Sequence, residues 1–195
     1  MSALSRSLLG SALLLLVVAG CRSSPTRLYT IRAVPVGAHH PDYRGPAMRV
    51  DSFHIPPGLD RSEVVWTIAP SELDIDDFAY WSAPLAQLAR QALSQDLFAL
   101  FPPGRVAFPD LPKPKGALGI DIDLLTLRVE QGRALLTAGW SVSPPAGKAN
   151  RERETATLEG PAGPGAAGVA DAYGVLLGKL AERIGADLAA HDDER

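Results

Sequence analysis

Apolar and polar residues alternate with a period of two in several segments of the chain, a pattern that predicts β-strands. Strands are predicted at residues 28–34, 48–55, 64–68, 73–75, 106–108, 119–130, 135–142 and 151–158. Residues 64–68 are predicted from their β-branched and aromatic side chains and not from alternation. Pro56-Pro57-Gly58 ends the second predicted strand, and Gln131-Gly132-Arg133 is a turn that joins the two longest strands into a hairpin. The charged run Arg151-Glu152-Arg153-Glu154 predicts that the last strand is exposed to solvent or lies at an edge, where charge discourages further pairing.

Alternation also assigns the side chains of each predicted strand to its two faces. In residues 48–55 it places Met48, Val50 and Ser52 on one face and Arg49, Asp51 and Phe53 on the other. In residues 119–124 the alternation is strict, which predicts a half-buried strand with Asp121 and Asp123 on its polar face.

The first segment with helical spacing follows residue 82. Ser82 is the expected N-cap, Pro84 fits the first turn, and the helix should end before Pro102. Its apolar face consists of Leu85, Leu88, Ala89, Ala92, Leu93, Leu97 and Leu100. Asp96 lies close to this face, so it is either at the rim or buried with a partner.

A second helix is predicted near the C-terminus, after a Gly/Pro/Ala linker at residues 160–168 and before a polar tail at 192–195. Its apolar stripe consists of Tyr173, Leu177, Leu180, Ile184 and Leu188. The order of strands, helix, strands and helix predicts an α+β fold, a mostly antiparallel sheet with two amphipathic helices packed on one face as a two-layer sandwich.

The N-terminal 20 residues have the pattern of an export signal. Arg6 gives a weakly positive start, and the apolar segment from Leu8 to Val18 is shorter than the roughly 20 residues that span a bilayer. The segment ends in Val18-Ala19-Gly20-Cys21, the lipobox pattern of bacterial lipoproteins, and Cys21 is the one cysteine in the sequence. We therefore expect Cys21 to carry a diacylglyceryl group and an N-acyl chain, with residues 21–27 as a tether and residues 28–191 as a single periplasmic domain.

The lipid chains on Cys21 would hold the protein on a membrane, because two acyl chains already give stable attachment. Arg22 follows the cysteine, in place of the aspartate that commonly retains lipoproteins in the inner membrane, which favours the outer membrane. With a formal net charge of −3 and no basic patch, the chain has no electrostatic signature of nucleic-acid binding.

Candidate chemistry in the sequence is sparse. Asp121 and Asp123 point the same way, but the polar face of an amphipathic strand explains them better than an acid/base or cation site. The acidic run at 74–77 lacks the glycine and glutamate of a calcium loop, and His39-His40 has no third ligand nearby. No nucleophile elbow is present, and Gly163-Pro164-Gly165 fits no phosphate-binding loop. We therefore expect no catalytic site, no metal site and no cofactor besides the covalent lipid.

The three tryptophans, Trp66, Trp81 and Trp140, are the most informative large side chains. We expect Trp81 and Trp140 in the core. Trp66 follows Val65 in a strand, so one of the two faces outward unless both faces of the sheet are covered, and an exposed tryptophan would mark a contact surface for lipid or protein.

Several motifs of the chain resemble one known family. They are Leu28-Tyr29-Thr30-Ile31, Ile55-Pro56-Pro57-Gly58-Leu59-Asp60-Arg61, Val64-Val65, Phe78-Ala79-Tyr80-Trp81-Ser82-Ala83-Pro84-Leu85 and Ala138-Gly139-Trp140-Ser141-Val142. With Cys21 ahead of them, the chain is similar to the ABC-type transport auxiliary lipoproteins, the PqiC-like family. The most specific part is Leu59-Asp60-Arg61 followed by Trp81-x-x-Pro84-Leu85.

The resemblance implies a non-enzymatic accessory component of a transport system that contains an MCE-domain protein and moves lipids between the inner and outer membranes. The MCE-domain protein is the expected partner, the lipoprotein would act as its dock, and a ring of identical subunits is a further expectation. Contacts with partner or lipid are expected in the loops 56–61 and 70–80, with Arg61, Trp66 and Tyr80 as candidate residues. Two alternatives stay open, an outer-membrane assembly or chaperone lipoprotein and a lipoprotein hydrolase.

Overall fold

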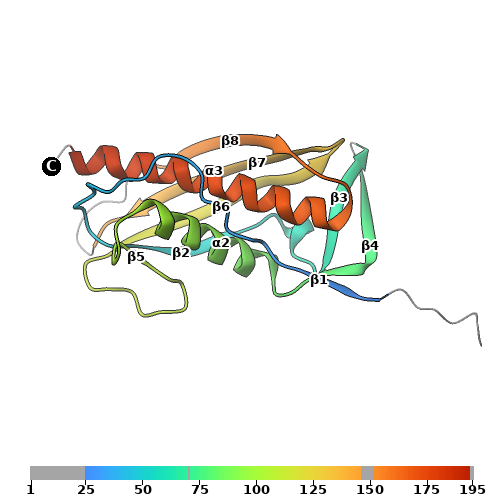
Figure 1. The fold of residues 1–195 in the computed structure, drawn as a ribbon, viewed down its shortest axis with the longest axis horizontal. Coiled ribbons are helices and arrows are strands. Elements are labelled where there is room, and N and C mark those ends of the chain that lie inside the picture. The colour runs from blue at the N-terminus through green and yellow to red at the C-terminus, as the bar shows by residue number, and fades with distance from the viewer. Residues whose placement is uncertain (1–24, 70, 146–151, 194–195) are drawn as a thin grey trace, which may run out of the picture.

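The computed structural model describes residues 25–69, 71–145 and 152–193 (Figure 1). Cys21 and the predicted signal segment lie outside these residues. The strands are β1 (Arg27–Tyr29), β2 (Met48–His54), β3 (Glu63–Ala69), β4 (Glu72–Trp81), β5 (Val106–Ala107), β6 (Leu118–Glu130), β7 (Arg133–Ser143) and β8 (Glu154–Pro161). The helices are the short 3-10 helix η1 (Pro57–Leu59), α2 (Leu85–Leu100) and α3 (Gly165–Asp193).

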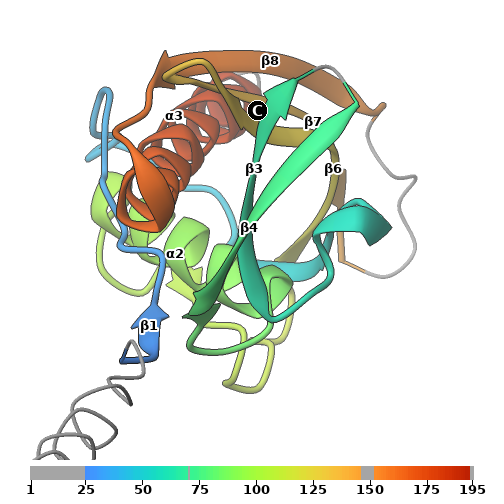
Figure 2. The same cartoon turned by 90° about the vertical axis from the view of Figure 1, so that its right-hand side faces the viewer.

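The eight strands form one mixed sheet whose order is β1-β4-β3-β6-β2-β5, with β7 and β8 continuing from the other edge of β6. The two longest pairings, β6 with β7 and β7 with β8, are antiparallel. β1 lies parallel to β4, and β2 lies parallel to both β5 and β6. Figure 2 shows α2 and α3 side by side on one face of this curved sheet, which confirms the predicted α+β sandwich.

The predicted hairpin at residues 119–142 is present as β6 and β7. Gln131 and Gly132 connect the two strands with φ angles of 49° and 76°, the left-handed conformation that two-residue hairpin turns require. Ile120, Ile122 and Leu136 are completely buried beneath the helices, so this hairpin forms the floor of the core. Alternation in residues 119–124 therefore predicted correctly which residues face the helices, whereas a register shift between Leu124 and Thr126 inverts it, so that Leu127 and Val129 are buried beyond that point.

Helix α2 has the predicted span but not the predicted N-cap. Pro84 occupies the cap position and no side chain caps the helix, while the backbone N–H of Ser82 donates to the carbonyl oxygen of Tyr29 at 2.7 Å. Ser82 therefore fastens β1 to the end of β4 instead of starting the helix.

Helix α3 begins at Gly165, inside the segment predicted as a linker, and reaches Asp193, inside the predicted polar tail. Small side chains such as Ala166 and Ala170 are buried there, so they continue the apolar stripe with little bulk. Near the other end, one carboxylate oxygen of Asp192 accepts the backbone N–H groups of Arg44 and Gly45, at 2.7 and 2.9 Å. The linker prediction was wrong because glycine and alanine were interpreted as loop signals where close packing needs small residues.

Residues 30–34, predicted as part of the first strand, are not in a strand. They pass instead over the face of α3 that carries Gly174 and Gly178. A Cβ atom at Gly174 would stand 2.5 Å from the carbonyl oxygen of Arg32, and one at Gly178 would overlap the carbonyl of Val34. The backbone thus packs directly on the helix, and β1 ends at Tyr29.

A β-bulge changes the faces that alternation assigned to β2. The pairing of β2 with β6 shifts register between Val50 and Ser52. Beyond the bulge Phe53 is buried with Met48 and Val50, whereas Ser52 points away from the core and donates to Asp121. The predicted faces were correct before the bulge and wrong after it, because one extra residue inverts the alternation.

Two further strands differ in length from their predictions. β4 continues from the predicted 73–75 to Trp81, beyond an irregularity in its pairing with β3. β8 begins at Glu154, so Glu152 and Arg153 precede it, and within the described residues it pairs with β7 alone. The last strand is therefore an edge strand as predicted, although the charged run stands mostly before it.

Candidate contact surface at the hairpin end

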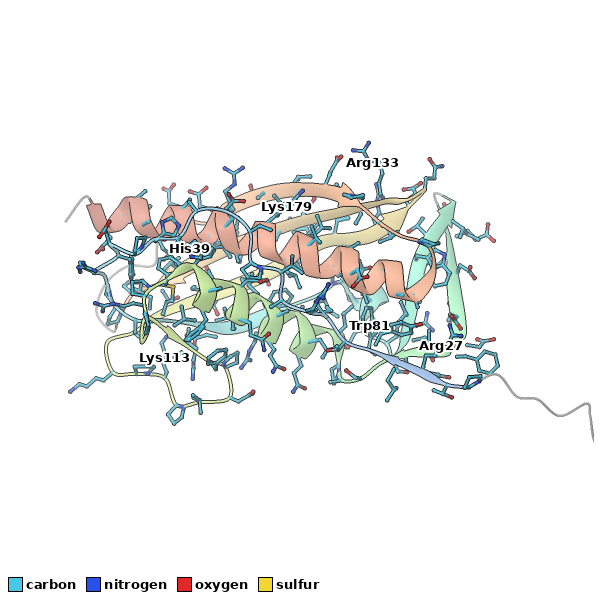
Figure 3. All side chains as sticks on the ribbon, viewed as in Figure 1. Arg27, His39, Trp81, Lys113, Arg133 and Lys179 are labelled. Carbon is cyan, nitrogen blue, oxygen red and sulfur yellow. The ribbon has the colours of Figure 1, made fainter. Side chains whose placement is uncertain are left out.

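Strands β1, β3 and β4 form one end of the molecule, here called the hairpin end. Figure 1 shows β3 and β4 projecting at this end beside β1, and Figure 3 places Arg27 and Trp81 near it, with His39 and Lys113 toward the opposite end. All three predicted contact residues lie on or beside these strands. The structure thus brings Arg61, Trp66 and Tyr80 into one region.

Arg61 lies just before β3 and is paired within its own segment. Its Nε donates to Glu63 Oε2 at 3.2 Å, and both side chains keep about a third of their surface exposed. Two hydrogen bonds hold the pKa of the Glu63 carboxyl below its ordinary value. The larger effect comes from the backbone N–H of Glu63 itself and the smaller from the side chain of Arg61. The guanidinium group is accessible to a partner that competes for this exposed ion pair, whose own contribution to stability is small.

Trp66 is half-buried and packs against the core, while Val65 is buried at 5% exposure. The expectation that one of the two faces outward is met by Val65, which points away from the helices but is covered by its neighbours. Trp66 offers only part of its ring to a partner.

Tyr80 is half-buried, and its hydroxyl donates to the carbonyl oxygen of Asp77 at 3.0 Å. The next residue, Trp81, points to the core and stacks on Tyr173 of α3, with ring centroids 6.0 Å apart. Trp140 is 2% exposed. The prediction that Trp81 and Trp140 belong to the core is confirmed.

This end also exposes large apolar side chains that the sequence pattern did not indicate. The exposed large hydrophobic residues in the described parts of the chain are Leu28, Ile68, Leu73, Ile75, Phe78, Phe98, Leu111 and Leu125. The first five of these all lie in β1, β3 and β4. The alternation Leu73-Asp74-Ile75 carried the signal, but it indicates only a two-sided strand and does not show that both sides are open to solvent.

The acidic run of β4 satisfies its own backbone. Asp74 Oδ1 accepts the N–H of Ile75, and Asp76 Oδ1 accepts the N–H of Phe78, each at 3.0 Å. Within the described residues no group of three or more His, Cys, Asp or Glu side chains could hold a metal ion. These aspartates act as local backbone acceptors in an irregular strand.

The polar face of the sheet accounts for Asp121 and Asp123. Asp121 accepts hydrogen bonds from Ser52 at 2.6 Å and Ser143 at 3.3 Å. Asp123 accepts from Arg153 at 2.6 Å and from His54 at 2.9 Å, and these bonds, chiefly that of Arg153, lower its pKa. The two carboxylates therefore tie neighbouring strands together.

Asp51, the residue at the β2 bulge, lies in a second network of this kind. Its carboxylate accepts hydrogen bonds from Lys113 Nζ at 2.5 Å and from Arg49 Nε at 2.7 Å. Burial raises the pKa of the Asp51 carboxyl, but the two cations outweigh burial and leave it below its ordinary value. Lys113 thereby fastens the proline-rich loop 109–116 to the sheet.

The histidine pair also has local partners. His39 Nδ1 lies 2.9 Å from the carbonyl oxygen of Ala99, and the ring of His40 stacks on Phe101 with centroids 5.1 Å apart. Both contacts attach the loop after residue 35 to the end of α2.

Asp96 of α2 has no such partner. It is 0% exposed, and neither carboxylate oxygen has a hydrogen-bond partner within the described residues. Burial raises its pKa to about 7, and the nearby backbone of Val34 offsets only part of that rise. The residue is buried, but without the partner that we expected for a buried position.

Comparison with known proteins now adds to this geometry. The family described as "ABC-type transport auxiliary lipoprotein component" matches residues 29–185. The chain belongs to this family. The match spans β2 to β8 and the larger part of α3, and it confirms the resemblance inferred from the motifs.

Two solved structures share the fold. The crystal structure of protein XCC0632 from Xanthomonas campestris, of family DUF330, is 15% identical with a TM-score of 0.63, covering 87% of this chain and 98% of that one. A crystal structure of an uncharacterized protein is 13% identical with a TM-score of 0.54, covering 83% and 98%. No curated protein sequence matches significantly.

The family assignment establishes this auxiliary lipoprotein as a component that accompanies an ABC-type transport system. A lipoprotein component implies attachment to a membrane, and an auxiliary component is consistent with a non-catalytic role. In the described part of the chain, neither helix is long and apolar enough to cross a bilayer.

Proposed function

We propose that this protein is the membrane-anchored dock of an MCE-type ABC transport system that moves lipids between the inner and outer membranes. The observation that carries the proposal is the family match over residues 29–185, on a chain that begins with a lipobox. The polar clusters agree with a non-catalytic role. The Ser52 and Ser143 hydroxyls both donate to Asp121, so that these groups form hydrogen bonds between neighbouring strands.

Attachment through Cys21 is the first part of the proposal. Its thiol would accept the diacylglyceryl group, and its new amine an acyl chain. Cys21→Ala should remain uncleaved by the lipoprotein signal peptidase and carry no lipid. Mass spectrometry of the mature N-terminus decides this, and an unmodified Cys21 or a different N-terminus in the unaltered protein would contradict it.

The outer membrane is the second part, and it is supported by Arg22 at the position after the cysteine. Density-gradient separation of the two membranes should find the protein with the outer one. Arg22→Asp is the matched variant that should move it to the inner membrane without altering the folded domain. If the unaltered protein were found with the inner membrane, that result would contradict the proposal.

The tether limits how the dock can work. The six steps from Cys21 to Arg27 span at most about 20 Å, so the folded domain stays close to the membrane that holds the lipid. An inner-membrane transporter would therefore extend its own component to the lipoprotein. We propose that Arg61 and the exposed part of Trp66 contribute to that contact, with a ring of identical subunits as the receiving form.

Photo-crosslinkers in cells test the contact. A crosslinking residue at Arg61 or Ile68 should capture the MCE-domain protein, whereas one at Leu111, equally exposed but in the loop after β5, should not. Capture at all three positions or at none would contradict this docking surface. Crosslinks that reach an outer-membrane barrel alone would favour the alternative, an assembly lipoprotein for another envelope machine.

A further inference from the structure

The strand register places several exposed apolar side chains on one face of the hairpin end. Leu28 stands beside Tyr80 in the pairing of β1 with β4, and their neighbours Tyr29 and Trp81 point to the core. Because successive side chains alternate, Leu28 and Tyr80 point away from the helices. Leu28 is 70% exposed.

The same face continues along β3 and β4. Val64 belongs to the core, so Val65 points outward, and Val65 is paired with Ile75. Thr67 is paired with Leu73 in the same way, which puts Leu73 and Ile75 on the outer face at 49% and 38% exposure. Residues opposite one another in an antiparallel pair share a face.

This set of residues, Leu28, Tyr80, Val65, Ile75 and Leu73, is here called the outer stripe. It runs from the edge strand to the far part of the hairpin. The acidic residues Glu72 and Asp74 alternate with its members and therefore point to the opposite face. The strand is amphipathic, with its apolar side directed away from the helices.

The position of the outer stripe relative to the anchor indicates what covers it. Leu28 is seven residues from Cys21, and the chain between Cys21 and Arg27 can span only about 20 Å. The end of the domain that begins with β1 is thus the end that the anchor holds nearest to the bilayer. An apolar face at that end lies within reach of the lipid interface, where burial of aliphatic side chains is favourable.

We infer that the outer stripe rests on the surface of the membrane that holds Cys21, so that the domain is oriented on the bilayer instead of turning freely on its tether. The contact is mainly apolar and does not depend on anionic lipid, because Glu72 and Asp74 face away, and Glu63, which lies opposite Tyr80 on this face, is paired with Arg61. The inference rests on the proposed lipid anchor, but not on the identity of the transport partner.

Depth measurements on the acylated full-length protein test the inference. The acylated thiol of Cys21 cannot react, so a cysteine introduced elsewhere is the single labelling site. Leu28→Cys and Leu73→Cys would carry a fluorescent label, in vesicles of phosphatidylcholine and phosphatidylethanolamine that contain spin-labelled lipids as quenchers. Leu111→Cys is the matched control, since Leu111 is 57% exposed but lies in the loop after β5.

Labels at positions 28 and 73 should lie about 5–10 Å below the headgroup level, and the label at 111 should stay in water. High salt should leave the depth unchanged, since screening acts only on charges. Acylated protein with all three labels in water would overturn the membrane contact alone, whereas a missing acyl group would overturn the anchor and the contact together. Labels at 28 and 73 that are shielded from water but not quenched by lipid would show that protein covers the stripe, which also overturns the inference.

Discussion

In the middle of the sheet, β6 directs Ile120, Ile122 and Leu127 toward α2 and α3, and each is at most 3% exposed. At the hairpin end, β4 carries a similar alternation, yet Leu73 and Ile75 remain 49% and 38% exposed. The two strands differ in which side is apolar, since the apolar side of β6 faces the helices, whereas Leu73 and Ile75 lie on the side of β4 that points away from them. An alternating strand therefore buries its apolar side in one place and exposes it in the other.

This contrast predicts how stability is divided between the two regions. Substitutions that disturb the contact of the sheet with α3 should have large effects, because they remove packing inside a single apolar cluster. Substitutions at the exposed members of the outer stripe, Leu28, Leu73 and Ile75, should barely alter folding, because much of their surface is in contact with water in the folded state as well.

The largest effect is expected for Trp81→Ala, at the junction of β4 with α3. Removing this ring leaves a cavity against Tyr173 and should lower the free energy of unfolding by about 3–5 kcal/mol. Chemical denaturation followed by circular dichroism measures it. A variant with unchanged stability but impaired partner binding would move Trp81 from the core to an interface.

The next largest effect is expected for Gly178→Val, which should lower the free energy of unfolding by about 3 kcal/mol. The valine side chain would overlap the carbonyl of Val34, where residues 32–34 pack on α3. Gly58→Val is the matched control, since a Cβ atom at Gly58 has nothing within 4 Å. Both are measured by the same denaturation experiment. Equal effects in the two variants would contradict the direct contact of backbone with helix.

Asp96→Asn should raise stability at pH 8 by about 2 kcal/mol. The Asp96 carboxyl titrates near 3.8 when unfolded and at about 7 when folded, so between these values only the folded state holds the proton. Stability of the unaltered protein should therefore fall as the pH rises from about 4 to about 7, by at most about 4 kcal/mol. The variant should lose this part of the pH dependence in unfolding curves, and identical pH profiles would show that Asp96 is stabilised by a partner after all.

The smallest effect is expected for Leu73→Ser, on the outer stripe. Its side chain is half exposed, so the free energy of unfolding should change by no more than about 0.5 kcal/mol. Leu127→Ser, at 3% exposure on β6, provides the contrast and should be severely destabilising. A loss of stability at Leu73 comparable with that at Leu127 would show that the hairpin end is as tightly packed as the middle of the sheet.

The sequence by itself determined the elements whose cause is local. Helical spacing defined residues 85–100, and alternation with a Gln131-Gly132 turn defined the long hairpin. The motifs around Asp60 and Trp81 were sufficient to indicate the family, which the match over residues 29–185 then showed. Each of these signals depends on residues close together in the chain, where periodicity and turn conformation are physical constraints.

Only the tertiary structure decided the features that depend on distant neighbours. The bulge at Asp51 brings Phe53 into the core, and the glycines of α3 admit the backbone of residues 32–34 in place of a strand. Likewise, Leu73 is exposed because it lies on the face of β4 that points away from the helices, which alternation along β4 does not record. Periodicity determines which side chains share a face, but whether that face is buried depends on which other part of the chain packs against it.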